Sequence, residues 1–588
     1  MQSYIPPIDD YRFLLEEVLD FDGAMTALGK DVDCGLATAV LEEAGKFCAD
    51  HLHPLNRQGD EQGARLVDGS VVMPDGFAAA YQAFVEAGWP SLAADPDHGG
   101  QGLPFILQLW LDEMLSASNL SFGLFPGLTR GAMEAIAAHA SDDLKTRYLA
   151  PLISGEWTGA MALTESGAGT DLALLKTKAE DLGDGRFAIT GQKIFISSGD
   201  HDMASNIVHL VLARLPDAPA GVKGISLFLV PKMLPDDTRN TMSVGALEKK
   251  MGIHAQPTCV MNYDGATGWL VGEPHRGLAA MFTMMNAERL MVGIQGLGIA
   301  GAAYQQAAAY AKDRLQGRSS DGGRGPVAII EHADVRRMLL KVRAFVEAGR
   351  ALAGWTALQW DRAQGHADPA IRADADALVA LLTPVVKAAF TDFGFESAVA
   401  AQQVFGGHGY IREWGMEQLV RDCRIAPIYE GTNGIQALDL LGRKVLGSQG
   451  KLMLGFTKRV HKFCETSAGH PQLQRYVEQV AGLNRDLGEI TKGIGMAAMK
   501  NPDEVGAASV DYLMYCGYLV LGYFWLRMAV VARSRLERAG HDAAFYQSKL
   551  ATAEFYFTRL LPRTAAHRAA IEAGSASLMK LAADQFAF

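Results

Sequence analysis

The chain has 588 residues, of which 49% are hydrophobic and 20% charged, and its formal net charge is −12 at pH 7. This composition excludes a fibrous or disordered protein, and the length predicts about three or four domains. The acidic balance also argues against a nucleic-acid-binding protein, because such proteins normally carry a Lys/Arg excess on the binding domain.

From residue 10 to about 155, apolar residues recur at helical spacing, as in "YRFLLEEVL", which predicts a helical N-terminal domain over residues 1–156. Short β-branched runs between turn residues, such as "SNIVHLVLARL", then predict a middle β domain over 157–275. Helical periodicity returns and predicts a helical bundle over 276–446. After the break "GSQG", further helical runs predict a C-terminal helical extension over 447–588.

Two helical segments carry features of other protein classes. "GLGIAG" at 296–301 fits the GxGxxG pattern of dinucleotide-binding proteins, but it lies inside a helical run and not between a strand and a helix. We expect these glycines to allow close helix packing. The apolar run at 512–526 is shorter than the ~20 residues of a membrane-spanning helix. It predicts a buried core or subunit-interface helix, with an interfacial membrane contact as the alternative and no stable insertion.

The first residues and the cysteines indicate the compartment. "MQSYIPPIDDYRFLLEEVL" has no basic region followed by an apolar one, so it does not predict a secretion signal. The six cysteines are scattered singly, without a CxxC pair or a nearby His at metal-ligand spacing. We therefore expect a cytoplasmic enzyme with reduced, mostly buried thiols and no metal site.

Three motifs could carry binding chemistry. In "MALTESGAGTDL", from residue 161, small residues and hydroxyls let backbone N–H groups approach an anionic ligand, although a plain β-turn explains the glycines equally well. In "GQKIFISSG", Phe195 and Ser197 lie on one side of a strand, where they could hold a flat ring or where a core Phe could simply pack. "QVFGGHGY" at 403–410 adds a second glycine turn.

"PIYEGTNG" at 427–434 places one carboxylate, Glu430, between an apolar segment and a glycine turn. A loop glutamate that caps the following helix is one interpretation, and a general base is the other.

The ordered motifs "LTESGAGTDL", "GQKIFISSG", "QVFGGHGY" and "RDCRIAPIYEGTNGIQ" resemble those of the acyl-CoA dehydrogenase family of flavoproteins, over about residues 1–446. The resemblance implies a mainly α fold with a central β domain: a helical N-terminal domain, a β-barrel middle domain and a helical bundle, to which this chain adds a C-terminal helical domain. With that extension, the chain is most similar to the subgroup of 3-methylmercaptopropionyl-CoA dehydrogenases.

The resemblance implies FAD as the cofactor, held in part by a neighbouring subunit that contributes Arg314 and Gln403 to Gly407. The implied FAD-binding residues are Met161, Leu163, Thr164, Gly169, Thr170, Phe195, Ile196, Ser197, Arg314, Gln403, Gly406, Gly407, Thr432 and Asn433. The residues implied to lie near the CoA or the thioester are Thr170, Asn286, Arg289 and Gly431.

The implied reaction oxidises a saturated acyl-CoA to the trans-2-enoyl-CoA, with the α-proton passing to Glu430 and the β-hydride to flavin N5. A carboxylate in water, with a pKa of about 4, is a poor base for a carbon acid. Exclusion of water and hydrogen bonds to the thioester oxygen must therefore assist it. Glu288 in "NAERL" occupies the position at which some family members carry the base. We expect it to be a second acid that tunes the base or shapes the pocket.

The resemblance also implies an electron-transferring flavoprotein as the electron acceptor and a homodimer as the assembly. Two alternatives stay open: an acyl-CoA oxidase, and a DNA-associated flavoprotein of the alkylation-response type, against which the acidic balance argues. The sequence does not decide between methylthiopropionyl, medium-chain and long-chain substrates.

Overall fold

The computed structural model describes residues 3–319, 325–538 and 543–587, and the chain divides into two compact units. The barrel unit comprises Glu43–Met291, and the helical unit combines the residues up to Glu42 with those from Val292 onward. Helices α3 (Cys34–Phe47) and α8 (Gly277–Asp313) contribute residues to both units.

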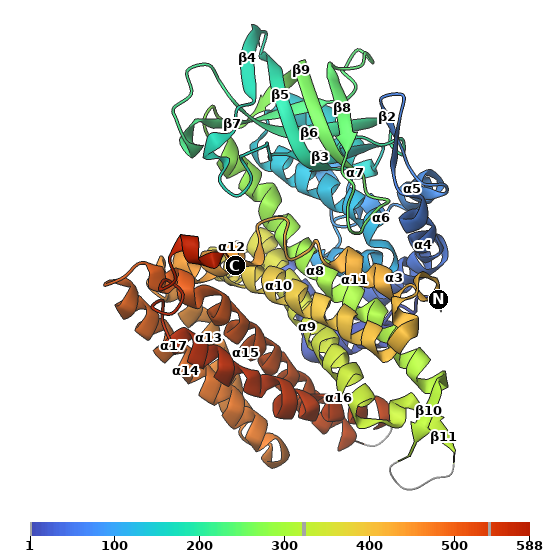
Figure 1. Cartoon of the computed structure of the whole chain (residues 1–588), viewed down its shortest axis with the longest axis vertical. Coiled ribbons are helices and arrows are strands. Elements are labelled where there is room, and N and C mark those ends of the chain that lie inside the picture. The colour runs from blue at the N-terminus through green and yellow to red at the C-terminus, as the bar shows by residue number, and fades with distance from the viewer. Residues whose placement is uncertain (1–2, 320–324, 539–542, 588) are drawn as a thin grey trace. The chain divides into compact units, whose positions relative to one another are not determined.

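Seven strands of the barrel unit form one sheet that closes on itself. The strands are β3 (Trp157–Ala162), β4 (Lys178–Gly183), β5 (Arg186–Ser197), β6 (Asn206–Arg214), β7 (Ile225–Pro231), β8 (Met242–Leu247) and β9 (Thr258–Val271). β5 pairs with β4 and β9, β9 pairs with β7, and both β4 and β7 pair with β6, which completes the ring (Figure 1). β3 lies parallel to β6, and β8 lies antiparallel to β9. The β-barrel expected for the middle of the chain is therefore confirmed.

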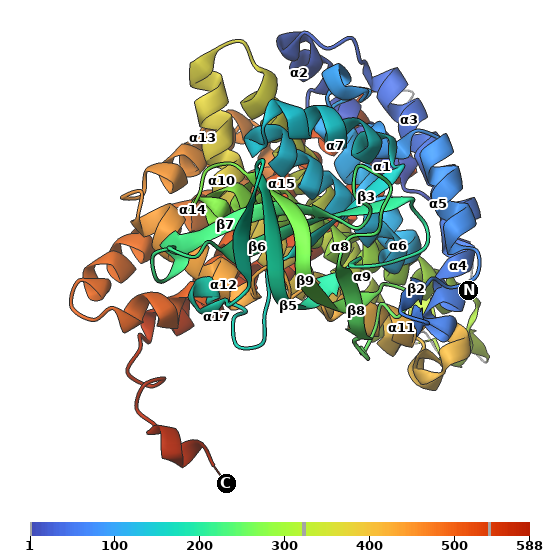
Figure 2. The ribbon, with the colours of Figure 1, turned by 90° about the horizontal axis from the view of Figure 1, so that it is seen from above.

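The sequence of β6 is a continuous apolar run because both of its faces are buried. Val208, Leu210 and Leu212 belong to a core that includes helices α6 (Phe105–His139) and α7 (Asp142–Ser154). Ile207 and Val211 belong to a second core inside the barrel. Because successive side chains of a strand point to opposite faces, one strand serves both cores. Figure 2 shows the antiparallel neighbours β5 and β9 side by side.

Helix α7 of the barrel unit begins at a side-chain cap, and helix α6 contains a kink. Ser141 precedes α7, and its hydroxyl accepts a hydrogen bond from the backbone N–H of Leu144 at 3.5 Å. Asn119 has non-helical backbone angles inside α6 and kinks that helix. The remaining elements of this unit are α4 (His53–Gln62), α5 (Phe77–Glu86), and the hairpin of β1 (Arg65–Val67) and β2 (Ser70–Val72).

The helical unit is built around three long helices, α9 (Ala333–Gly365), α10 (Pro369–Val404) and α15 (Asp503–Leu536), which contact one another. α10 begins after Asp368, whose side chain accepts a hydrogen bond from the N–H of Ala370 at 2.8 Å. Figure 1 shows the C-terminal helices, in orange and red, alongside α9 and α10. The other elements are α1 (Ile8–Phe13), α2 (Phe21–Leu28), α11 (Met416–Cys423), α12 (Asn433–Leu438), α13 (Lys451–Ser467), α14 (Gln474–Ala498), α16 (Ala543–Phe555), α17 (Thr564–Glu572), β10 (Leu315–Arg318) and β11 (Pro326–Ala328).

The glycines of "GLGIAG" lie inside α8 and allow close helix packing, as predicted. A Cβ atom on Gly296 would lie 2.5 Å from the carbonyl oxygen of Phe390 on α10, and one on Gly394 would lie 2.5 Å from the carbonyl oxygen of Gly296. Any larger residue at either position would force the two helices apart.

Two helices, α10 and α15, are long and apolar enough to span a membrane, but 83% of the apolar window of each is buried within the fold. This burial is typical of core helices and agrees with the core prediction for 512–526.

All six cysteines are also buried and form no disulfide. Within the described ranges, no three His, Cys, Asp or Glu side chains are grouped as metal ligands.

A buried ion cluster joins the N-terminal helix to the C-terminal extension. The Asp10 carboxylate in α1 binds both Arg350 of α9 and Lys549 of α16, and Lys549 also lies 3.0 Å from Glu347. All four side chains are buried. Burial alone would raise the pKa of Asp10, but the two cations hold it below its ordinary value.

We expect Lys549→Met to destabilise the helical unit by about 3–5 kcal/mol, because it leaves a buried carboxylate without one of its cations. Urea unfolding together with hydrogen exchange of α1 measures this loss. Lys492→Met, at an exposed position on α14, is the matched control. Since the pKa of Asp10 is depressed, its contribution is present at neutral pH and is lost as the pH falls through that pKa. If Lys549→Met were as stable as Lys492→Met, the proposed role of Lys549 in the ion cluster would be contradicted.

Candidate active site

The glycine-rich motif after β3 forms a tight turn closed by two backbone hydrogen bonds between Glu165 and Ala168, of 3.1 and 3.0 Å. Gly167 and Gly169 are exposed, and no atom lies within 4 Å of where a Cβ atom would stand on either. The neighbouring Thr170 is exposed as well. The turn therefore offers open backbone and a hydroxyl to a ligand.

Hydrogen bonds of the buried Glu165 side chain hold this turn in place. Its carboxylate accepts hydrogen bonds from the backbone N–H groups of Lys176 (2.6 Å) and Thr177 (3.0 Å), from the Thr177 hydroxyl (2.6 Å) and from Lys193 Nζ (2.8 Å). Lys193 Nζ also donates to the carbonyl oxygen of Leu163 at 2.9 Å. Burial lowers the pKa of Lys193 to about 8, against the opposing effect of Glu165. These two residues were not among the sequence-predicted site residues.

Phe195 lies at an irregularity of β5, where the pairing with β9 shifts between Lys193 and Ile196. Its φ is +60°, which is rare for an aromatic residue, and its side chain is 59% exposed. Ile196 is buried beneath it, and the following Ser197 is half-buried. The bulge thus holds an apolar ring at the surface, beside a hydroxyl.

The structure brings the first two motifs together. The backbone N–H of Ile194 donates to the carbonyl oxygen of Thr164 at 2.9 Å, so the glycine turn and the Phe195 bulge are adjacent. Met161 lies on β3 and Leu163 directly after it, both leading into the turn. An exposed ring, three hydroxyls and open backbone fit a flat cofactor with polar edges and an anionic group, such as FAD.

The acid predicted on α8, Glu288, lies in a buried ion cluster of the barrel unit. It interacts electrostatically with Arg130 of α6, which also binds Asp112 at 2.5 Å and interacts with Glu134. Burial raises the pKa of Glu134 to about 7, although Arg130 opposes the shift. A Cβ atom on Gly131 would lie 2.7 Å from Glu288 Oε1, so this segment of α6 passes close to the carboxylate. Glu288 therefore has a cation partner within its own unit.

Arg289 follows Glu288 but is buried, which excludes a helix-surface ion pair. Its guanidinium donates to Asn286 Oδ1 at 3.3 Å and lies over the ring of Phe282, 5.8 Å from the centroid. Asn286 itself is exposed.

Glu430 lies in the helical unit, in the turn that precedes α12. Its φ is +54°, and Gly431 after it has φ +83°. A left-handed conformation is costly for a residue with a Cβ atom, so the surrounding contacts must impose it. Gln436 Nε2 donates to the carbonyl oxygens of Glu430 (3.2 Å) and Gly431 (3.4 Å), and Asn433 N–H donates to that of Pro427 (3.0 Å).

The residues after Glu430 fasten the turn to α10. The Asn433 amide contacts Thr391, donates to Asp392 Oδ1 at 2.7 Å, and accepts from Lys387 Nζ at 3.0 Å. Thr432 caps α12, because its hydroxyl accepts from the N–H of Ile435 at 3.4 Å. The Asn433 side chain is thus engaged by the protein itself, and any contribution to a cofactor would come through the position of its backbone.

The second glycine turn follows α10. Gln403, Gly406 and Gly407 are exposed, and no atom lies within 4 Å of a Cβ placed on either glycine. His408 stacks on Trp414, with 4.6 Å between the ring centroids, and its Nδ1 lies 2.9 Å from Tyr310 OH, so it is a packing residue. Arg314, just after α8, is exposed.

The predicted residues therefore form two groups. Met161 to Ser197, Asn286, Glu288 and Arg289 belong to the barrel unit, and Arg314, residues 403–407 and Glu430 to Asn433 belong to the helical unit. Sequence analysis missed Glu165, Lys193 and Arg130. Lys193 carried a weak signal, because it is a charged residue inside the strand motif "GQKIFISSG".

Comparison with known families matches almost the whole chain. Residues 37–156 match "Acyl-CoA dehydrogenase, N-terminal domain", 160–266 the middle domain and 275–446 the C-terminal domain of the same family. Residues 456–582 match "Acetyl-CoA dehydrogenase C-terminal like".

Full-length relatives agree with these matches. The chain is 43% identical to 3-methylmercaptopropionyl-CoA dehydrogenase of Ruegeria pomeroyi, over 98% of this chain and 99% of the relative. It is 35% identical to a butyryl-CoA dehydrogenase of Syntrophomonas wolfei, over 95% of both chains. The structure of a Bacillus anthracis acyl-CoA dehydrogenase complexed with FAD shares the fold, with a TM-score of 0.75 at 20% identity over 95% of this chain and 91% of that one.

Four consecutive domain matches and full-length relatives above 30% identity lead to one conclusion: the chain belongs to the acyl-CoA dehydrogenase family.

Proposed function

We propose that this FAD-dependent acyl-CoA dehydrogenase oxidises short, linear acyl-CoA thioesters, with Glu430 as the general base. The observation that carries the assignment is the backbone of Glu430. A carboxylate-bearing residue is held in the left-handed region, at φ +54°, by a hydrogen-bonded turn. Such backbone strain is a recurrent feature of active sites, because a functional group must be aimed where an unstrained chain would not place it.

The barrel unit supplies the groups that would hold the flavin. Phe195 offers its exposed ring, Ser197 and Thr170 offer hydroxyls, and the open turn at Gly167 and Gly169 offers backbone N–H groups. Arg314, Gln403, Gly406 and Gly407, which are exposed, would contribute from the helical unit of a neighbouring subunit. FAD, when bound, supplies a hydride acceptor for the β-hydrogen.

Residues of the protein, and not the cofactor, carry out the proton transfer. The Glu430 carboxylate takes the α-proton, and its own backbone N–H donates to the thioester oxygen, where negative charge develops. Gly431 has no side chain to obstruct the thioester, and Gln436 holds the two carbonyl groups of the turn. Entry of the acyl chain excludes water, which strengthens the base.

We expect Glu430→Gln to slow anaerobic flavin reduction by about 100- to 10,000-fold, because the amide cannot accept the proton. Glu288→Gln should change that rate much less and lower the melting temperature, because it removes one partner of the largely buried Arg130. Single-turnover bleaching of the flavin and thermal unfolding measure the two effects. If Glu288→Gln alone abolishes reduction, the base has been assigned to the wrong residue.

The Glu165–Lys193 pair predicts a second effect, on cofactor retention. Lys193→Met should destabilise the barrel unit by about 3–5 kcal/mol and lower its FAD content, because the carboxylate beneath the glycine turn loses its cation. Adding Glu165→Gln to Lys193→Met should restore part of the stability. Lys178→Met, at an exposed position on β4, is the control. Full FAD content in the Lys193 variant would exclude this anchoring role.

The substrate proposal rests on the relatives, which are named for 3-methylmercaptopropionyl-CoA and for butyryl-CoA. We expect anaerobic titration of the yellow enzyme to bleach the flavin with 3-methylmercaptopropionyl-CoA and with butyryl- to hexanoyl-CoA. Pentanoyl-CoA is the matched control for 3-methylmercaptopropionyl-CoA. It has a methylene group in place of the thioether sulfur, so it shows whether the sulfur itself matters. Bleaching with long-chain thioesters alone would contradict a short-chain preference. Peroxide release when the reduced enzyme meets air would indicate an oxidase.

The remaining proposals concern partners and location. The electron acceptor implied by the family resemblance is an electron-transferring flavoprotein. The enzyme is a homodimer located in the cytoplasm. Light scattering of the purified protein tests the dimer by measuring its molecular mass.

A further inference from the structure

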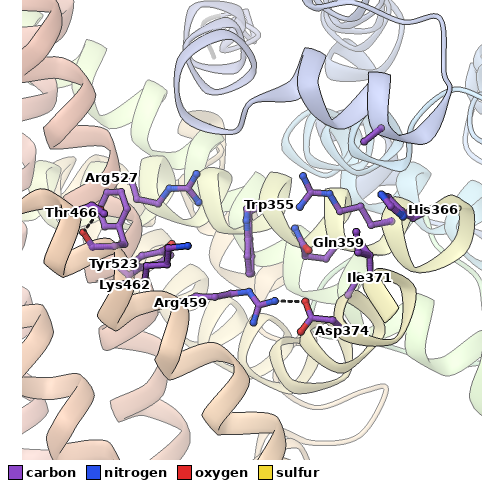
Figure 3. Close-up of a pocket in the computed structure, with 14 residues that line it drawn as sticks. Trp355, Gln359, His366, Ile371, Asp374, Arg459, Lys462, Thr466, Tyr523 and Arg527 are labelled. Atoms are coloured by element: carbon purple, nitrogen blue, oxygen red, sulfur yellow. Dashed lines mark hydrogen bonds and ion pairs between the residues drawn. The ribbon is translucent and has the colours of Figure 1, made fainter. Parts of the chain in front are cut away.

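The helical unit contains a cavity of about 620 Å³ that the proposed reaction does not use. Four helices and the end of α2 line it: α9, α10, α13 and α15, with Ala27 from α2 (Figure 3). Because α13 and α15 belong to the C-terminal extension, the cavity exists only in a chain that carries this extension. Its volume lies within the range typical of small-molecule sites, about 300–1,000 Å³.

The lining is strongly basic, although the chain as a whole is acidic. It contains Arg362, Arg459, Lys462 and Arg527, against a single acid, Asp374, which is paired with Arg459. His366 also lines the cavity.

Three of these cations have no carboxylate at ion-pair distance among the residues that the structure describes. Arg527 donates to the carbonyl oxygen of Val18 at 2.5 Å and lies over the rings of Tyr523 and Phe524. Burial and the nearby Arg459 lower the pKa of Arg362, against the opposing effect of Asp20. Like charges gathered in one cavity repel each other, and an anion would relieve that repulsion.

A buried donor points to a ligand independently of the charge. Gln359 lines the cavity and is only 4% exposed. Its Nε2 is buried and has no hydrogen-bond acceptor in the described part of the chain. An unsatisfied buried donor of this kind is destabilising, so an oxygen of a ligand that reached it would stabilise the fold as well as bind.

Aromatic side chains form the other walls. Trp355 from α9, Phe463 from α13 and Tyr523 from α15 all line the cavity, and Figure 3 shows Trp355 beside Gln359 and above Arg459 in that view. A planar ring can stack on such surfaces, while the guanidinium groups of Arg362 and Arg527 suit phosphate oxygens.

We propose that this cavity is a binding site for a polyphosphate joined to a flat ring, the chemistry of a nucleoside diphosphate. The four basic side chains bind the phosphates, Gln359 donates to an oxygen of the ligand, and the aromatic walls hold the ring. Such a site would make the C-terminal extension a ligand-binding part of the enzyme, separate from the residues assigned to oxidation.

Isothermal titration calorimetry of the FAD-loaded enzyme with ADP, pyrophosphate and adenosine tests the site. We expect ADP to bind with micromolar affinity that weakens with salt, and pyrophosphate and adenosine each to bind at least about tenfold more weakly, because each keeps only half of the contacts. Equal affinity for pyrophosphate and ADP would overturn the assignment of the ring, and no binding of any probe at millimolar concentration would overturn the site.

Substitutions of cavity residues test whether ADP binds in this cavity. Arg362→Gln and Lys462→Gln should each weaken ADP binding at least about tenfold, and Gln359→Leu should weaken it as well. Lys451→Gln, which removes the same charge from the exposed start of α13, should leave the affinity unchanged. Retained acyl-CoA oxidation by each variant shows that it is folded. ADP binding that survives both Arg362→Gln and Lys462→Gln would show that the cavity is not the site.

Two sources of this chemistry exist, a free nucleotide and the nucleotide end of CoA. A titration with CoA separates them. If the cavity holds the CoA nucleotide, wild-type enzyme binds a second equivalent of CoA that Arg362→Gln abolishes. If it holds a free nucleotide, Arg362→Gln leaves CoA binding intact and abolishes that of ADP. Both results support the site and identify its ligand.

Discussion

The buried carboxylate of Asp10 is the constraint on which the helical unit depends. A charge can remain buried only if cations compensate it, and here Arg350 of α9 and Lys549 of α16 do so together. Glu17 adds contacts of the same kind, to Arg535 at 2.8 Å and to Tyr546 at 2.7 Å. The first helix, the bundle and the C-terminal extension therefore fold as one body.

This arrangement gives the extension a structural place and creates new surface within the unit. α15 packs against α9 and α10, and Trp525 donates to the carbonyl oxygen of Ala344 at 2.9 Å. Where α13 meets the other helices, packing is incomplete and the basic cavity remains. A shorter chain that ended near residue 446 would have neither α13 nor α15, and hence no such cavity.

The two groups of candidate site residues, one in each unit, are held by different physical means. In the barrel unit, the buried Glu165–Lys193 pair and a bulged strand fix an open turn and an exposed aromatic ring. In the helical unit, hydrogen bonds from Gln436 and Asn433 impose positive φ on Glu430. In both groups, irregular backbone carries the candidate residues and regular structure supports it, which is why short motifs with glycine mark these places in the sequence.

The sequence by itself determined the family, the fold class, the barrel and the position of the candidate base, because these depend on local periodicity and on short motifs that are contiguous in the chain. It also indicated that "GLGIAG" packs helices, since the residues around it are helical. Only the tertiary structure revealed the Asp10–Lys549 contact, the Glu165–Lys193 pair, the partner of Glu288 and the basic cavity. Asp10 and Lys549 are 539 positions apart, and Arg130 and Glu288 lie on different helices. No local pattern encodes such pairs, because their proximity results from how buried surfaces pack.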